Sequence, residues 1–118
     1  MNNPQPTPSF DESIKQVMQT LPVPVRNYLA QGKYTSVARG LMAKYSLHID
    51  QGAVVEREIM LLLMGVENPS EFIQALYSEA RLDKKAVDGI VRDVNEQIFI
   101  PLREEMRKVV TAPAKPPR

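Results

Sequence analysis

Six consecutive apolar residues, 59–64, form the most hydrophobic stretch of the chain. Successive residues of a helix are rotated by about 100°, so this run covers the whole helix circumference and needs protein on every side. The run is too short to span a membrane, which takes about 20 apolar residues. The pattern predicts a central buried helix over residues 54–64, introduced by Asp50 or Gly52. On this interpretation, Leu62→Ala should cost ~2–5 kcal/mol of stability.

Apolar residues recur at three- and four-residue spacings in several other segments, as they do on one face of a helix. The chain breaks between these segments contain proline or glycine, such as Pro22, Gly32 and Asn68-Pro69. We expect further helices over residues 11–21, 25–31, 35–45, about 69–82, and 84–110.

The ends of these helices can also be predicted. Thr35 or Ser36 is expected to cap the helix over 35–45, and Asp83 is expected to cap the last helix. Pro101 lies inside that last helix, where its ring would clash with the carbonyl of Gln97. A kink, or a junction between two helices, is therefore expected at Pro101.

No segment shows the alternation of apolar and polar residues that is typical of a strand. The predicted fold class is all-α, a compact bundle of five or six helices around a central helix, with a long C-terminal helix kinked at Pro101. Prolines are frequent in residues 1–9 and 111–118, which we expect to be disordered arms. A single helical domain is left over residues 10–110.

Composition excludes several classes of function. The 118 residues carry a net charge of +1, whereas a general nucleic-acid binder usually carries a basic excess. The absence of cysteine removes disulfides, thiolate metal sites and cysteine nucleophiles. No basic segment followed by an apolar segment opens the chain, so we expect no secretion signal, no membrane span and a cytoplasmic location.

Signatures of catalysis are missing. The single histidine, His48, lies two residues from Asp50 in a predicted connection, and an isolated pair of this kind is far more often a surface feature than a catalytic one. No glycine-rich phosphate loop and no clustered metal ligands occur. We expect no enzyme activity, no cofactor and no bound metal.

Charge is distributed unevenly along the chain. Residues 22–48 carry four basic and no acidic side chains, whereas residues 49–83 carry seven acidic side chains and two arginines. Two oppositely charged faces in one small domain favour a protein-interaction or adaptor function, including self-association between copies. The expected contact residues are Arg26, Lys33, Tyr34, Arg39 and Lys44 on the basic side, and Glu67, Glu71 and Glu79 on the acidic side.

A nucleic-acid-binding function is the alternative. Tyrosines lie within the basic 22–48 segment, and aromatic side chains between basic ones can stack on single-stranded bases. Tyr34, directly before the helix over 35–45, is the tyrosine most expected to be exposed. This function predicts retardation of oligonucleotides that is lost when Arg39 and Lys44 become Glu.

Three segments resemble small helical proteins found in bacteria with reduced genomes: Leu21-Pro22-x-Pro24-Val25-Arg26-x-Tyr28-Leu29; Glu56-x-Glu58-x-x-x-Leu62-Leu63-x-Gly65-Val66-x-x-Pro69-x-x-Phe72; and Asp93-Val94-Asn95-x-x-Ile98-Phe99-x-Pro101-Leu102-Arg103. The resemblance covers about residues 10–108 and implies a helical fold, but it supplies no site residue. The size and helix number are also similar to those of the death-fold class of interaction bundles, an analogy of fold alone.

Overall fold

The computed structural model describes residues 16, 17 and 19–111, with the side chains of 109–111 outside that description. The segment 11–21 was predicted as the first helix, and its residues 16, 17, 19 and 20 are helical. Residues 11–15 and 18 of that segment lie outside the described residues. The predicted arms also lie outside it, apart from Thr111, which ends the last helix.

The described part of the chain is all-helical, as predicted. Helices α6, η1 and α7 follow one another without a break, so they form one long C-terminal helix with a π-helical segment inside it. The elements are α2 (Val23–Ala30), α3 (Lys33–Lys44), α4 (Ile49–Leu63), α5 (Pro69–Ser78), α6 (Lys84–Val94), η1 (Asn95–Phe99) and α7 (Ile100–Thr111).

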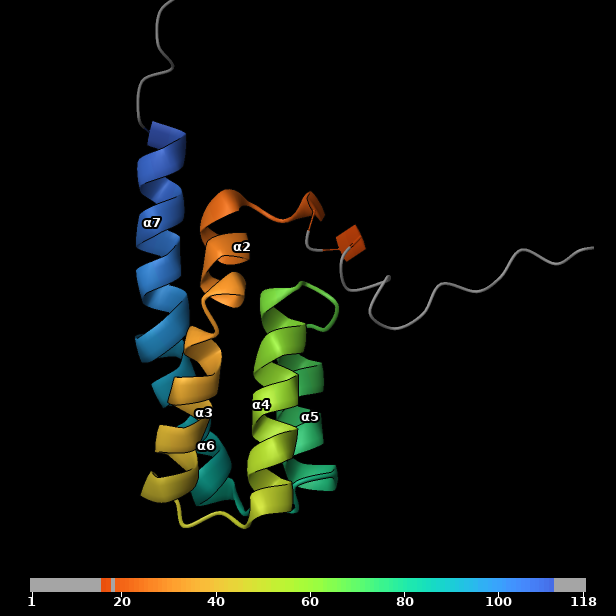
Figure 1. The fold of residues 1–118 in the computed structure, drawn as a ribbon. Helices are drawn as coiled ribbons and strands as arrows, with labels where there is room; N and C mark the ends of the chain where they lie inside the picture. The colour runs from red at the N-terminus through yellow and green to blue at the C-terminus, as the bar shows by residue number, and fades with distance from the viewer. Residues whose placement is uncertain (1–15, 18, 112–118) are drawn as a thin grey trace, which may run out of the picture.

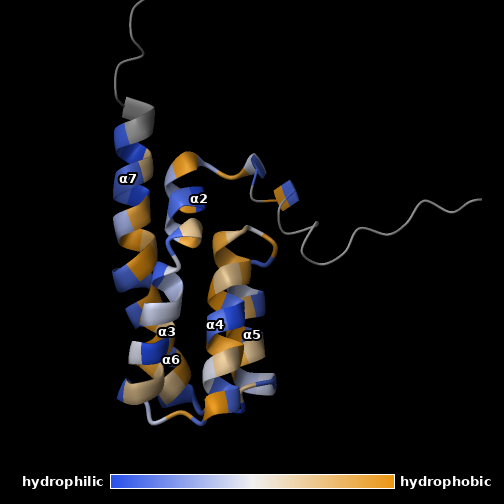
Figure 2. Ribbon diagram, in the orientation of Figure 1, coloured by the Kyte–Doolittle hydropathy of each residue, from blue (hydrophilic) through white to orange (hydrophobic). Residues whose placement is uncertain are grey.

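The helices stand roughly upright in Figure 1, with α4 and α5 paired on one side and the long α6–η1–α7 helix on the other. Helices α2 and α3 are stacked end to end between them, and α4 packs against α2, α3 and α5. The upper turns of α7 extend past α2 in this view and are mostly hydrophilic in Figure 2.

The hydrophobic core collects the inward faces of all these helices. The predicted spacing is confirmed along the C-terminal helix, where the apolar stripe is buried from α6 into α7. The largest fully buried side chains are Phe72, Leu41, Ile59, Leu76, Ile90, Ile98, Val55 and Val87.

The central helix differs from its prediction in two ways. It begins at Ile49, before either Asp50 or Gly52, because His48 serves as its N-cap and the backbone N–H of His48 donates to Oε1 of Gln51 at 2.8 Å. The apolar run is also not covered on every side. Ile59, Leu63 and Met64 are buried, but the side chains at positions 60–62 are half-buried.

Two other boundaries were predicted wrongly. The N-cap of α3 is Gly32, in a left-handed conformation with φ of 67°, and not Thr35 or Ser36. The same glycine ends α2, so one residue both stops a helix and starts the next. Helix α5 ends at Ser78 rather than near residue 82, and Arg81 then takes a left-handed conformation.

Pro101 is accommodated by a π-helical turn. The N–H of Ile100 donates to the carbonyl of Asn95, five residues back, so the carbonyls ahead of Pro101 are shifted out of their α-helical register. The apolar residues Ile90, Val94, Ile98 and Leu102 are spaced by four, which in an α-helix advances about 40° per step. The π-helical turn holds more residues per turn, which reduces this angular advance. All four side chains therefore stay buried.

Candidate functional site

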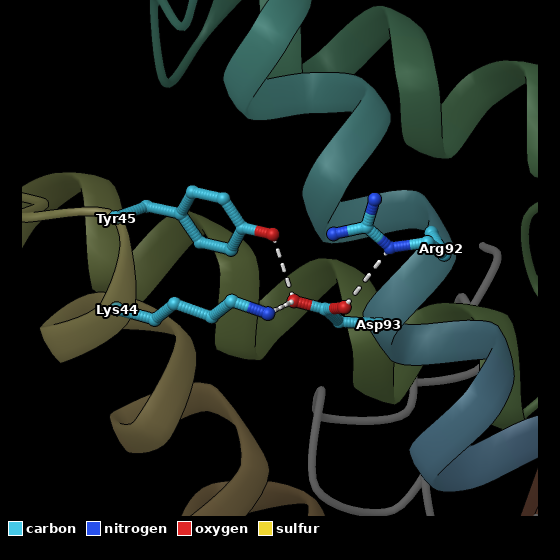
Figure 3. Close-up of polar contacts among 4 residues, drawn as sticks. All are labelled: Lys44, Tyr45, Arg92 and Asp93. Carbon is cyan, nitrogen blue, oxygen red and sulfur yellow. Dashed lines mark hydrogen bonds and ion pairs between the residues drawn. The ribbon is translucent and has the colours of Figure 1, made fainter.

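A buried carboxylate joins the end of α3 to α6. Asp93 is 4% exposed, and its Oδ2 accepts hydrogen bonds from Nζ of Lys44 and from the hydroxyl of Tyr45, both at 2.7 Å. Nε of Arg92 lies 3.4 Å from Oδ1 (Figure 3). Burial would raise the pKa of Asp93, but the hydrogen bonds from Lys44 and Tyr45 outweigh it and hold the pKa below its ordinary value.

Gly89 makes room for this cluster. A Cβ at Gly89 would overlap the hydroxyl of Tyr45 and lie 2.8 Å from Cε1 and Cζ of its ring. The tyrosine can therefore cross α6 to reach Asp93 only because position 89 has no side chain. The cluster fixes the orientation of α6 relative to α3 and also anchors Arg92, whose side chain is 61% exposed.

A second buried carboxylate lies on α4. Glu58 is 2% exposed, and its Oε2 accepts from Nε of Arg57 at 2.9 Å. Oε1 of Glu58 and Oε1 of Glu67 are both buried without a hydrogen-bond donor. Burial, followed by the hydrogen bond with Glu58 and the charge of Glu58, raises the pKa of Glu67 to about 8. At pH 7 the carboxyl group of Glu67 is therefore mainly protonated, and its proton is available to a neighbouring acceptor such as Glu58.

Glu67 is held in place by the turn that joins α4 to α5. Gly65 has φ of 71°, and the N–H groups of Gly65 and Val66 donate to the carbonyls of Leu62 and Leu61, which is the Schellman pattern. On the other side, Asn68 and Glu71 form a capping box with two bonds of 2.9 Å. The backbone of Glu67 is thus fixed on both sides.

Two grooves meet at Glu67. The first lies between α4 and α5, has a volume of about 690 Å³ and is lined mostly by polar residues. Its acidic side chains include Glu58, Glu67, Glu71 and Glu79, and Nη2 of Arg57 binds Oε1 of Glu79 at 2.6 Å. We call this the acidic groove.

The second groove, which we call the apolar groove, lies between the α4–α5 region and the α6–η1–α7 helix and has a volume of about 400 Å³. Clefts of this size with mostly apolar walls and a few polar groups are typical of binding sites. The π-helical segment forms part of its wall, and such segments often occur at functional sites. The apolar lining residues are Leu62, Pro69, Phe72, Ile73, Val91, Val94 and Phe99.

The polar side chains of the apolar groove make its mouth positive at neutral pH. They are Glu67, Arg92, Asn95 and Arg103. Arg103 donates from Nη2 to Oδ1 of the neutral Asn95 at 3.2 Å and has no carboxylate partner within the described residues. Since Glu67 is protonated at pH 7, the charges at the groove are those of the two arginines.

The basic residues expected from the sequence are not gathered into one site. Arg26, Lys33 and Arg39 form no ion pair within residues 16, 17 and 19–111 and are at least partly exposed. Lys44 is bound to Asp93. Tyr34 is half-buried and packs against the hydrophobic core.

The acidic residues expected from the sequence are brought together but are used within the molecule. Glu67, Glu71 and Glu79 all line the acidic groove. Burial and the neighbouring Glu58 raise the pKa of Glu67, Glu71 caps α5, and Glu79 binds Arg57.

Other candidate chemistry stays at the surface. His48 and Asp50 are exposed at the start of α4. Among the described residues, no group of three or more His, Asp or Glu side chains could hold a metal ion. None of the helices in that part of the chain combines the length and hydropathy that a bilayer-spanning helix needs.

Comparison of the chain with protein families, with curated proteins and with solved structures finds no match. The resemblance to helical proteins of reduced-genome bacteria stays a prediction.

Several residues of the two grooves were not singled out from the sequence. Arg92 and Arg103 read as ordinary members of a charged helix surface, and their shared position depends on how the long helix passes α5. Glu58 carried a usable signal, because a carboxylate within a helix predicted to be buried needs a partner.

Proposed function

We propose that this chain is a non-enzymatic protein-interaction domain that binds a partner segment in the apolar groove. The groove itself carries the proposal: it combines about 400 Å³ of mostly apolar lining with a mouth that is positive at neutral pH. Apolar grooves between helices commonly receive the apolar face of an amphipathic helix.

Charge complementarity defines the partner. Arg92 and Arg103 are exposed, and an acidic side chain beside the docked apolar residues could bind either guanidinium. The proposed occupant is therefore an amphipathic protein segment with apolar anchors and flanking Asp or Glu residues. An adaptor function of the kind expected from the sequence is consistent with such a surface.

Binding through the basic 22–48 segment remains a separate prediction. Its cations Arg26, Lys33 and Arg39 have no ion-pair partner in the described part of the chain, which suits an acidic surface. The stacking expected for nucleic acid has less support, because Tyr34 packs against the core. Oligonucleotide retardation at low salt tests this prediction: the native chain should retard the oligonucleotide, and Arg39→Glu should weaken the retardation.

The proposed function can be tested with a synthetic amphipathic helix of about four turns that carries Leu on one face and Glu at its flanks. We expect saturable binding that weakens about tenfold in Arg103→Glu, because an attractive charge pair becomes a repulsive one. Isothermal titration calorimetry measures the affinities.

Lys108→Glu is the matched control, since it reverses one charge on the same helix away from the groove. Its affinity should stay close to that of the native chain. An equal loss of peptide affinity in Arg103→Glu and Lys108→Glu would contradict the proposal. Equal binding of a peptide with Lys in place of Glu would contradict it as well.

A further inference from the structure

The carboxyl pair of Glu58 and Glu67 has the arrangement of a proton-operated latch. The two side chains come from α4 and from the turn that follows it, and they interact with each other where both line the acidic groove. The Oε1 atom of each is buried without a donor. Two carboxylates in this position would repel each other, whereas one shared proton converts the same contact into a hydrogen bond.

The charged surroundings keep the pair asymmetric. On α4, Arg57 binds Oε2 of Glu58 and so stabilises a negative charge there, which places the proton on Glu67. On α5, Glu71 faces Glu67 and adds a second repulsive charge, while the charge of Glu79 is paired with Arg57. Across the apolar groove the facing charges are Arg92 of α6 and Arg103 of α7.

Glu67 is the one residue that lines both the acidic groove and the apolar groove among those described here. Its ionisation would therefore have two effects at the binding site. It would place a negative charge at the mouth of the apolar groove, and it would push the Gly65–Asn68 turn away from α4.

We propose that the proton shared by Glu58 and Glu67 fastens the Gly65–Asn68 turn to α4, and that loss of this proton to solvent makes the apolar groove release an acidic partner. This inference rests on the proposed function of the groove. It adds a control of partner binding by pH, which neither the groove lining nor the arginines would supply by themselves.

The test compares the native chain with Glu67→Gln, whose neutral amide can still donate to Glu58. The control is Glu56→Gln, which removes one charge from α4 outside both grooves. Carboxyl carbon resonances are followed by NMR from pH 4 to 10, and the affinity for the acidic amphipathic peptide is measured at pH 6.5 and 9.

We expect one carboxyl of the native chain and of Glu56→Gln to titrate near pH 8, and this resonance to be missing in Glu67→Gln. Peptide affinity should fall several-fold between the two pH values in the native chain and the control, and should change less in Glu67→Gln.

Titration of every glutamate in the ordinary acidic range would contradict the shared proton, whatever the affinity of the peptide. An affinity equally dependent on pH in all three proteins would also overturn the proposal. Failure of the peptide to bind at either pH would instead remove the proposed function of the groove, and the titration would still decide whether the proton is shared.

Discussion

Asp93 shows how single residues determine the packing of this fold. The carboxylate is buried, yet hydrogen bonds from Lys44 and Tyr45 compensate its desolvation, and Gly89 leaves the space that the tyrosine ring needs. The sequence predicted that Tyr45 faces the core but did not predict its partner. Tyr45 and Asp93 are 48 positions apart, and no local pattern links residues at such a separation.

Replacing this buried charge should be costly. We expect Asp93→Asn to lower the free energy of unfolding by ~1.5–3 kcal/mol, because hydrogen bonds to a charged acceptor are lost. Asp88→Asn, on the exposed face of the same helix, should change it by less than ~1 kcal/mol. Urea denaturation at pH 7 measures both.

The same comparison has a defined pH dependence. The folded pKa of Asp93 lies below its ordinary value of 3.8, so the contribution of this carboxylate is fully present above that value and is lost as the pH falls below it. The stability difference between the native chain and Asp93→Asn should shrink on acidification. A difference that grows on acidification would contradict the assigned role.

At the scale of elements, chain breaks were predicted better than helix starts. Gly32 and Gly65 permit the left-handed conformation that ends a helix, and Pro69 restricts φ to a value suited to a first turn. The ends of α2 and α4 and the start of α5 therefore follow from the sequence. The start of α4 at Ile49 was not predicted, because histidine is an uncommon N-cap and the side chain of Gln51 accepts the capping bond from the N–H of His48. The π-helical turn before Pro101 depends on tertiary packing of the stripe.

Helix α4 gives the sharpest test of packing. Ile59 is fully buried, and its replacement by alanine should cost ~2–5 kcal/mol. Leu62 is half-buried and lines the apolar groove, so Leu62→Ala should cost only ~1–2 kcal/mol, less than a fully surrounded helix would require. Thermal and urea denaturation of both variants measure the difference, and equal losses would show that Leu62 is enclosed.

The Glu58–Glu67 pair makes a prediction at this scale as well. The folded protein holds the Glu67 proton up to about pH 8, whereas the unfolded chain releases it near 4.5. Raising the pH between these values therefore favours unfolding. The melting temperature of Glu67→Gln should rise relative to that of the native chain between pH 6 and 9, and a constant difference would argue against a shared proton.

At the scale of the whole molecule, the bundle and its core could be predicted from apolar spacing, but the proposed binding surface could not. Charge counts along the chain predicted two opposite faces, whereas the fold uses Glu67, Glu71 and Glu79 in internal contacts. The apolar groove combines residues from α4 to α7, which only the packing of the helices brings together.

The most direct test of the account is to map where an acidic amphipathic peptide contacts the protein, from amide chemical-shift changes during an NMR titration. We predict that the changes cluster around the apolar groove, at Phe72, Ile73, Val91 and Phe99. Changes confined to Arg26, Lys33 and Arg39 on α2 and α3 would instead identify the basic segment as the contact surface and contradict the assignment of the groove.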